Sequence, residues 1–245
     1  MRLNTEEKTR YSRQLLINGY SERKQERLKE STAMIAGIGG LGGNAALYLA
    51  AAGIGRLILV HPGELESPDM NRQILMSSEC VGEERTNIAQ RRLKEINPFT
   101  EVITISEWIT EDNADGIVSK ADIILDCRHN FEERYLLNKT CVRYKKPMIE
   151  GAMDDMFGYI TTIIPGETPC LSCLFPEYPE WDYLGFAVLG AVPGTLGNLM
   201  ALEAIKVITG LGNPLYSELL TFDGLTMDFK KLKLQRDSNC SVCGN

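Results

Sequence analysis

The chain has 245 residues, 44% of them hydrophobic, which is enough for one large α/β core. Its net charge of −7 and pI near 5.1 argue against a nucleic-acid-binding surface, because such surfaces are basic. No apolar run reaches the roughly 18 to 20 residues of a membrane span, and no signal-peptide core is present, so we expect a cytoplasmic protein. The seven cysteines, dominated by two C-x-x-C pairs, fit a reducing compartment better than a disulfide framework.

The first two thirds of the chain alternate between strand and helix patterns. After a charged helical arm over residues 5–30, apolar strands are predicted at 32–36 and 56–60, with an alanine-rich helix at 41–52 between them. Further strands are predicted at 102–105, 123–127 and 148–150, and further helices at 84–95, 112–119 and 130–144. This alternation predicts a Rossmann-like, doubly wound α/β fold with a mostly parallel sheet.

The last third has a different pattern. We expect a strand at 159–164, an apolar helix at 196–209, and a hairpin formed by 217–222 and 227–234 around Asp223-Gly224. No repeat or linker is evident, so we expect one domain over residues 1–245. It would comprise an N-terminal arm (1–30), a nucleotide-binding core (31–165) and a C-terminal part (166–245).

A glycine-rich loop, Gly37-Ile38-Gly39-Gly40-Leu41-Gly42-Gly43, joins the first predicted strand to the first long helix. Such a loop allows close approach of the backbone to a phosphate and aims helix N-terminal amides at it. Arg72, in Asn71-Arg72-Gln73, adds fixed positive charge after the second strand, which favours ATP over NAD. An NAD-dependent oxidoreductase is a weaker alternative, because His61 stands where an acid should bind the ribose.

The two C-x-x-C pairs predict a closed zinc site. Cys170, Cys173, Cys240 and Cys243 supply four thiolates, which is the ligand set of a tetrahedral structural zinc. The alternative is that these cysteines are redox-active or unligated. A zinc deaminase also carries a P-C-x-x-C segment, but the H-x-E half of its motif is missing here.

Several stretches in order resemble the MoeB/ThiF/HesA family of adenylyltransferases related to ubiquitin-activating enzymes. They are Arg10-Tyr11-Ser12-Arg13-Gln14-Leu15, the glycine loop, Leu49-Ala50-Ala51-Ala52-Gly53-Ile54-Gly55, Asn71-Arg72-Gln73, Asp126-Cys127 with Asn130-Phe131, Leu202-Glu203-Ala204-Ile205-Lys206 and both cysteine pairs. The resemblance implies a homodimer with a four-cysteine zinc site. It also implies that the enzyme activates a carboxylate as an acyl-adenylate and releases pyrophosphate, with Arg72 on the ATP phosphates and Arg13 reaching them from the partner subunit.

The sequence departs from the family pattern at three positions. His61 replaces the family's ribose-binding aspartate, for which Glu64 or Glu66 could substitute from the same loop. Arg85 replaces a phosphate-contacting lysine while keeping its charge. His129 replaces an aspartate that helps to hold magnesium, although Asp126 remains. The sequence therefore does not decide whether this chain holds magnesium in the way the family does.

Adenylation is a displacement at the α-phosphate, and its catalysis consists largely of positioning and charge neutralisation. The resemblance therefore points to Arg13, Arg72 and Arg85 as catalytic residues, and to ATP and structural zinc as cofactors, with magnesium uncertain. The expected nucleotide-binding residues are Gly37, Gly39, Gly40, Leu41, Gly42, His61, Glu64, Asn71, Arg72, Arg85, Asp126 and His129.

The resemblance leaves the acceptor carboxylate open. Family members that form an acyl-thioester or acyl-disulfide use a cysteine in the crossover loop, and residues 177–186 contain none, so transfer would pass to a separate thiol or sulfur-transfer protein. These departures favour a small cofactor-precursor acid, such as the guanylylpyridinol of the iron-hydrogenase cofactor. The other substrate class is the C-terminal glycine of a ubiquitin-like sulfur carrier. A catalytically silent binding module is a further alternative, against which the intact arginines argue.

Overall fold

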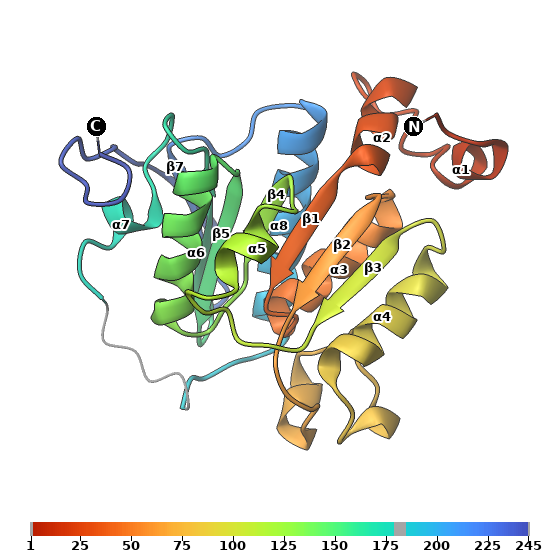
Figure 1. The fold of residues 1–245 in the computed structure, drawn as a ribbon, viewed down its shortest axis with the longest axis horizontal. Coiled ribbons are helices and arrows are strands. Elements are labelled where there is room, and N and C mark those ends of the chain that lie inside the picture. The colour runs from red at the N-terminus through yellow and green to blue at the C-terminus, as the bar shows by residue number, and fades with distance from the viewer. Residues whose placement is uncertain (1, 179–184, 245) are drawn as a thin grey trace.

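A single mixed sheet organises the protein. The structure, a computed structural model, describes residues 2–178 and 185–244 (Figure 1). The eight strands have the spatial order β3-β2-β1-β4-β5-β6-β7-β8. They are β1 (Thr32–Ala36), β2 (Arg56–Val60), β3 (Glu101–Ile105), β4 (Ile123–Asp126), β5 (Met148–Asp154), β6 (Phe157–Ile163), β7 (Glu218–Asp223) and β8 (Asp228–Lys233). The predicted Rossmann-like α/β fold is therefore confirmed.

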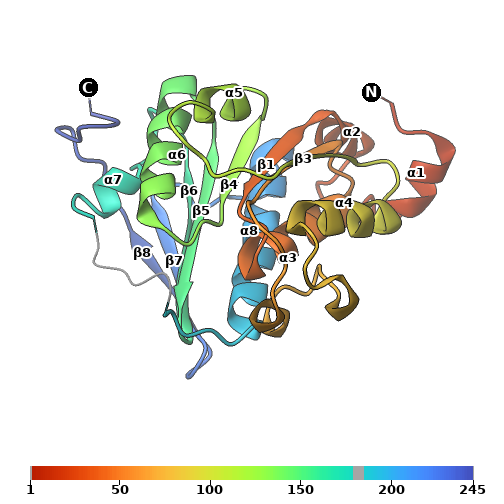
Figure 2. The ribbon, with the colours of Figure 1, turned by 60° about the horizontal axis from the view of Figure 1, so that its bottom comes forward.

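Helices cover both faces of the parallel part of the sheet, as two views show (Figures 1 and 2). The helices are α1 (Thr5–Arg10), α2 (Glu22–Glu30), α3 (Gly40–Ala52), α4 (Arg85–Ile96), α5 (Ala114–Val118), α6 (Phe131–Tyr144), α7 (Leu171–Leu174) and α8 (Ala191–Thr209). On β1, Ala33 and Ile35 join the core beneath α3, α4 and α8, whereas Met34 and Ala36 join the core beneath α5 and α6. Because side chains alternate along a strand, this five-residue apolar run can fill two cores.

The topology places a crevice at one edge of the sheet. From β1 the chain builds β2 and β3 on one side and β4 and β5 on the other, with parallel pairing throughout. Ligands of such sheets bind beyond the carboxyl ends of the strands, where the order reverses. The glycine loop lies at this point, between β1 and α3.

The C-terminal third extends the sheet by antiparallel pairing. Strand β5 runs to Asp154, beyond the predicted end at residue 150, because it pairs with β6 along its whole length through a tight turn. Strands β7 and β8 form the predicted hairpin and pair with β6. Helix α8 begins at Ala191, five residues before the predicted start at 196.

Helix α8 has the length and apolarity of a membrane span, which the sequence analysis did not anticipate, and half of its apolar window is buried inside the protein. Its small residues allow it to approach α3 closely, since a Cβ on Gly197 would lie 2.3 Å from the carbonyl oxygen of Leu41. This contact explains why a core helix can be apolar on most of its sides.

The predicted N-terminal arm is a pair of short helices, α1 and α2, at the end of the sheet opposite the glycine loop. The hydroxyl of Tyr11 accepts a hydrogen bond from Asn97 at 2.8 Å, and the amide of Gln14 donates to the carbonyl of Ala52 at 3.0 Å. Both partners lie at helix C-termini: Asn97 directly follows α4, and Ala52 is the last residue of α3. The arm therefore lies on the amino-terminal edge of the parallel strands.

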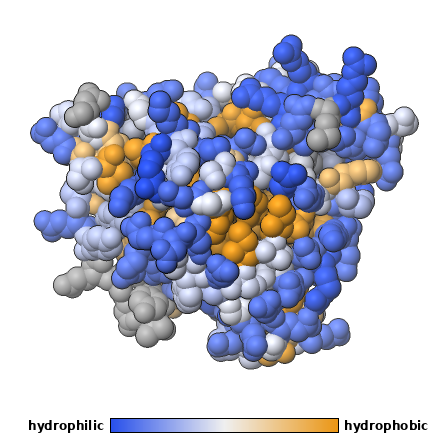
Figure 3. Space-filling view, in the orientation of Figure 1, coloured by the Kyte–Doolittle hydropathy of each residue, from blue (hydrophilic) through white to orange (hydrophobic). Residues whose placement is uncertain are grey.

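One stretch of the sheet has no helix over it. In the space-filling view, hydrophobic side chains show between α5 and α4, over β2 and β3 (Figure 3). Ile103 on β3 is 38% exposed there. The loop from β3 to α5 crosses this face (Figure 1), and its Trp108 lies against Arg128, which follows β4 at the carboxyl edge of the sheet.

Candidate functional site

A cavity of about 420 Å³ lies at the carboxyl edge of the parallel strands. Its size falls within the range of small-molecule sites, about 300 to 1,000 Å³. One end is polar and is lined by the glycine loop, the ends of β2 and β4, and the segment after β2. The other end is mainly apolar and is lined by Phe131, Ala152, Met153, Asp154, Phe157, Gly158, Tyr159 and Phe175. Phe186, Val188 and Pro193 also line the cavity, next to Arg72, Asn71 and Gly40.

The glycine loop can be built only with glycine at two positions. Gly37 has φ +90°, and a Cβ there would lie 2.7 Å from the carbonyl oxygen of Cys127. At Gly42, a Cβ would lie 1.8 Å from the carbonyl oxygen of Gly37. Neither residue lines the cavity, so both shape the turn, whereas Gly39, Gly40 and Leu41 line the cavity.

Asp69 holds two predicted arginines side by side at the polar end. Its Oδ1 accepts from Arg72 Nη2 at 3.0 Å, and its Oδ2 accepts from Arg85 Nη2 at 2.5 Å. Asp69 itself is fixed, because it forms a reciprocal capping interaction with Glu66 around a short 3-10 helix. Both arginines line the cavity, and Arg85 Nε is buried without a hydrogen-bond partner. The pair of guanidinium groups is therefore preorganised for an anion.

His61 supports the glycine loop and presents a donor to the cavity. Its Nδ1 accepts a hydrogen bond from the backbone N–H of Ile38 at 2.9 Å, so the ring proton is on Nε2. Burial, together with the nearby charges of Arg128 and Arg85, holds the pKa of His61 well below its ordinary value. His61 is therefore a neutral donor at physiological pH.

Arg128 follows β4 and adds another cation. It is 1% exposed, its Nε donates to Glu133 Oε2 at 2.7 Å, and its guanidinium lies 5.1 Å from the ring centroid of Trp108. Its Nη2 approaches Glu133 without the alignment of a hydrogen bond. The neighbouring His129 has a pKa of about 4, because of burial and the charges of Arg128 and other arginines.

A buried charge network lies under the cavity floor. Arg134 on α6 is paired with Glu150 on β5 and donates to the carbonyl of Gly151 at 3.0 Å. Glu150 stands opposite Asp126 in the β4–β5 register, and the Oε2 of Glu150 and the Oδ2 of Asp126 both lack a hydrogen-bond donor. Burial, with the charge of Asp126 close by, raises the pKa of Glu150 well above its ordinary value. The raised pKa favours the protonated form of Glu150, whose O–H can donate to the orphan Oδ2 of Asp126 across the β4–β5 register.

Seven of the predicted nucleotide-site residues line the cavity together. They are Gly39, Gly40, Leu41, His61, Arg72, Arg85 and His129. The other five predicted residues do not line it: Gly37 and Gly42 shape the turn, and Glu64, Asn71 and Asp126 lie outside the cavity.

Among them, Glu64 is exposed and forms an isolated bridge with Glu84. The side chain of Asn71 accepts from Arg72 and donates to the carbonyl of Val188, and Asp126 is fully buried below the floor. Arg13 is exposed on the N-terminal arm, at the opposite edge of the sheet.

Sequence reasoning missed several lining residues, namely Asp69, Gln73, Arg134 and Tyr159, and left the role of Arg128 open. Arg128 could be considered because it follows a strand predicted to end at the carboxyl edge of the sheet. Arg134 lies on a helix, and Tyr159 on an antiparallel strand, so neither carried a signal of proximity to the glycine loop.

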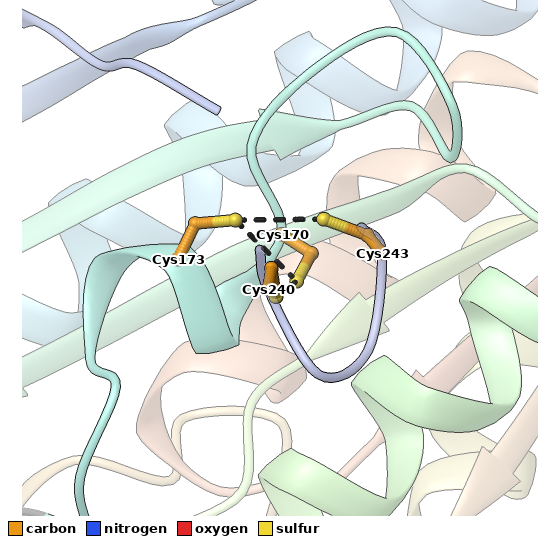
Figure 4. A group of neighbouring side chains, drawn as sticks. All are labelled: Cys170, Cys173, Cys240 and Cys243. Carbon is orange, nitrogen blue, oxygen red and sulfur yellow. Dashed lines mark hydrogen bonds between the residues drawn. The ribbon is translucent and has the colours of Figure 1, made fainter. Parts of the chain in front are cut away.

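The four predicted zinc ligands form one cluster, whose side chains converge on a common point (Figure 4). Their sulfur atoms all lie within 4.8 Å of one another, with Sγ–Sγ distances of 3.4 Å for Cys173–Cys243 and 3.7 Å for Cys170–Cys240. A tetrahedral ZnS₄ centre with bonds of about 2.3 Å requires separations of about 3.8 Å. The donor set and its spacing therefore fit zinc, which would join the C-terminal segment to α7.

The cysteine-free crossover segment over residues 177–186 lies largely outside the described residues. On either side of the gap, Phe186 lies 5.4 Å from the guanidinium of Arg72, and the hydroxyl of Tyr135 donates to the carbonyl of Glu177 at 3.2 Å.

Comparison with known proteins gives a consistent family assignment. The ThiF family model matches residues 11–242. Protein HesA of the heterocyst of Trichormus variabilis is 57% identical over 243 residues, covering 99% of this chain and 91% of HesA. The sulfur carrier protein adenylyltransferase of Thermus thermophilus is 37% identical over 254 residues, covering 100% and 94% of the two chains.

Solved structures show the same fold. A crystal structure of E. coli MccB with MccA-N7isoAsn has a TM-score of 0.88 and 27% identity, covering 99% of this chain and 76% of that one. Family match, sequence similarity and fold agree over nearly the whole chain, and the chain belongs to the ThiF family, as an ATP-dependent adenylyltransferase of the ubiquitin-activating-enzyme-like class.

Proposed function

We propose that the enzyme adenylates the C-terminal carboxylate of a polypeptide tail, of the kind carried by ubiquitin-like sulfur carriers. The observation that carries this proposal is the two-ended cavity, with arginines and the glycine loop at one end and mainly apolar side chains at the other. The first end suits a triphosphate, and the second suits an extended tail whose carboxylate must reach the α-phosphate.

Exposed apolar side chains, beginning with Phe157 of the cavity lining, support a macromolecular substrate. We define the apolar rim as Phe157, Leu189, Leu225 and Met227, which are 50%, 57%, 77% and 68% exposed. They come from three segments: the β5–β6 turn, the loop before α8 and the β7–β8 turn. Asp155 N–H donates to the carbonyl of Ala187 at 2.9 Å, and Gly224 N–H donates to the carbonyl of Met156 at 2.7 Å. Large side chains exposed next to a cavity mark a surface for protein contact.

The chemistry of adenylation assigns distinct tasks to the residues of this site. A carboxylate oxygen attacks the α-phosphorus, the bond to the β-phosphate oxygen breaks, and pyrophosphate leaves, giving an acyl-adenylate. Arg72 and Arg85 neutralise the charge that develops on the pyrophosphate, and the amides of Gly39 to Leu41 contact the phosphates. His61 donates to an oxygen of the nucleotide. Zinc would be held by the four cysteines as a structural ion, apart from the reacting atoms.

The proposal includes a homodimer and a single adenylating domain. Arg13 lies at the far edge of its own sheet, so it takes part in the chemistry only if a second copy brings it to the cavity. Transfer of the activated acyl group would then pass to a separate thiol or sulfur-transfer protein.

A small cofactor-precursor acid such as guanylylpyridinol is the second candidate. The apolar end contains Phe131 and Phe175 in an edge-on contact with ring centroids 6.3 Å apart, and Tyr159 lies 5.9 Å from Phe175. An aromatic pocket of this kind also suits a planar ring.

Exchange of labelled pyrophosphate into ATP separates these candidates. We expect exchange with a ubiquitin-like carrier ending in Gly-Gly, and no exchange when its last carboxylate is an amide. Leu225→Asp at the rim should raise the KM for the carrier, whereas Arg56→Gln, at the amino-terminal edge of the sheet, should not. Exchange with guanylylpyridinol alone would assign the small-molecule substrate. Failure to bind ATP would remove the proposal altogether.

A further inference from the structure

Carboxylates able to hold a metal are scarce at the polar end of the cavity. Asp69 lines it, but each of its oxygens accepts from an arginine. Asp154, the other lining acid, is exposed at the end of β5. Within residues 2–178 and 185–244, the one group of His, Cys, Asp or Glu side chains placed to hold a metal is the four-cysteine cluster.

Asp126, the remaining candidate for the family's magnesium, does not fit such a site. It is fully buried below the floor, and its Oδ1 accepts from the backbone N–H of Arg128 at 3.0 Å. Its Oδ2 lies 3.9 Å from Arg134, and Asp126 stands opposite Glu150 in the β4–β5 register. Magnesium requires hard oxygen ligands in octahedral geometry and keeps several waters, whereas this carboxylate adjoins a cation and is closed off from solvent.

Fixed donors occupy the same end of the cavity. His61, Arg72, Arg85, Arg128 and His129 line it. Arg85 Nε is buried without a hydrogen-bond partner, and Arg128 Nη2, although 2.5 Å from Glu133 Oε2, makes no aligned hydrogen bond. An unsatisfied buried donor costs free energy, and a ligand oxygen that accepts from it removes that cost.

We propose that this enzyme binds the pyrophosphate portion of its nucleotide through Arg128 together with Arg72, Arg85 and His61, and not through a magnesium ion held by protein carboxylates. The inference rests on the proposed function, since it concerns the same cavity. Magnesium then enters the site only as an ion already bound to ATP. The guanidinium groups supply the charge neutralisation, and their positions are set in advance by Asp69 and Glu133.

Calorimetric titration with inorganic pyrophosphate tests this arrangement. We expect the wild-type protein to bind pyrophosphate in EDTA, with an affinity no weaker than in excess magnesium, because magnesium masks the charge that the arginines recognise. Arg128→Met with Glu133→Gln removes the cation without leaving a buried unpaired carboxylate. It should weaken binding in EDTA about tenfold to a hundredfold, as expected for loss of a charge-assisted contact.

The chain offers a matched control. Arg56 Nε donates to Glu101 Oε2 at 2.8 Å, the same atoms as in the Arg128–Glu133 pair, at the opposite edge of the sheet. Arg56→Met with Glu101→Gln should leave pyrophosphate binding unchanged. Thermal unfolding of both double variants checks that the fold is retained. As a second variant, His129→Asp adds a carboxylate, and should weaken binding in EDTA and recover it with magnesium.

The proposal is overturned if wild-type protein binds pyrophosphate only with magnesium, if the folded Arg128 double variant binds as tightly as wild type, or if His129→Asp binds more tightly in EDTA. These outcomes differ from failure of the proposed function. An enzyme active in pyrophosphate exchange but dependent on magnesium for pyrophosphate binding refutes only the present inference. A protein that binds pyrophosphate in EDTA but activates no carboxylate refutes only the proposed function.

Discussion

The charge state of His129 gives a quantitative test of the site's electrostatics. Its pKa is about 4, against 6.5 for an ordinary histidine, because burial and nearby arginines disfavour the imidazolium. When the pKa of a histidine is depressed in the folded state, the free energy of unfolding has its full value above the unfolded pKa, where the ring is neutral in both states. That stabilisation is lost as the pH falls from about 6.5 toward about 4, since the unfolded chain then binds the extra proton.

The expected loss follows from the two pKa values. At pH 5, linkage between 6.5 and about 4 gives about 2 kcal/mol relative to pH 7, and solvent screening of this half-buried ring reduces it to about 1 to 2 kcal/mol. His129→Gln abolishes this contribution. Between pH 7 and pH 5, the free energy of unfolding should therefore fall by about 1 to 2 kcal/mol more in the wild-type protein than in His129→Gln.

Two measurements check this prediction. Urea unfolding at pH 7, 6 and 5 gives the difference in free energy between the two proteins. NMR of the ring Cε1–H groups follows each histidine directly, because the chain contains two and the variant assigns one. We expect neither ring to titrate between pH 8 and 5.5. Parallel stability curves, or a His129 midpoint near 6.5, would refute the electrostatic account of the cavity.

The other predictions concern the nucleotide, the dimer and zinc. Arg72→Ala should weaken the binding of ATP much more than that of adenosine, and an equal loss in calorimetry would exclude a phosphate contact. Arg13→Ala and Arg72→Ala should each be inactive, while mixing them after subunit exchange should restore roughly a quarter of the sites; a monomer, or no recovery, would exclude a role in trans. The purified protein should carry close to one zinc per chain, and Cys170→Ser should lower the thermal midpoint before it affects ATP affinity; metal analysis without zinc would contradict this.

The sequence predicted the fold well because its signals are local. The apolar strands, the glycine turn and the hairpin at Asp223-Gly224 each follow from neighbouring residues, and all appear in the structure. The extension of β5 to Asp154 was missed because it depends on pairing with β6, which no local pattern reveals.

Among the predicted site residues, those at strand ends next to the glycine loop, such as His61 and His129, line the cavity. The placement of the others depends on tertiary pairing. Asp126 is withdrawn below the floor by its register with Glu150, and Arg134 enters the site from the helix that follows the loop after β4. Such placements depend on contacts between segments, and spacing along the chain does not encode them.

The close contact between α3 and α8 has a mechanical consequence. Gly197 of α8 touches the backbone of Leu41, and a Cβ on Gly190 would lie 2.1 Å from the carbonyl oxygen of Asn71. With no compressible side chain between them, the phosphate turn and the start of α8 behave as one rigid unit. Any closure around a bound nucleotide must therefore come from hinges elsewhere, and the turns that carry the apolar rim can adjust to an arriving partner without disturbing the geometry of phosphate recognition.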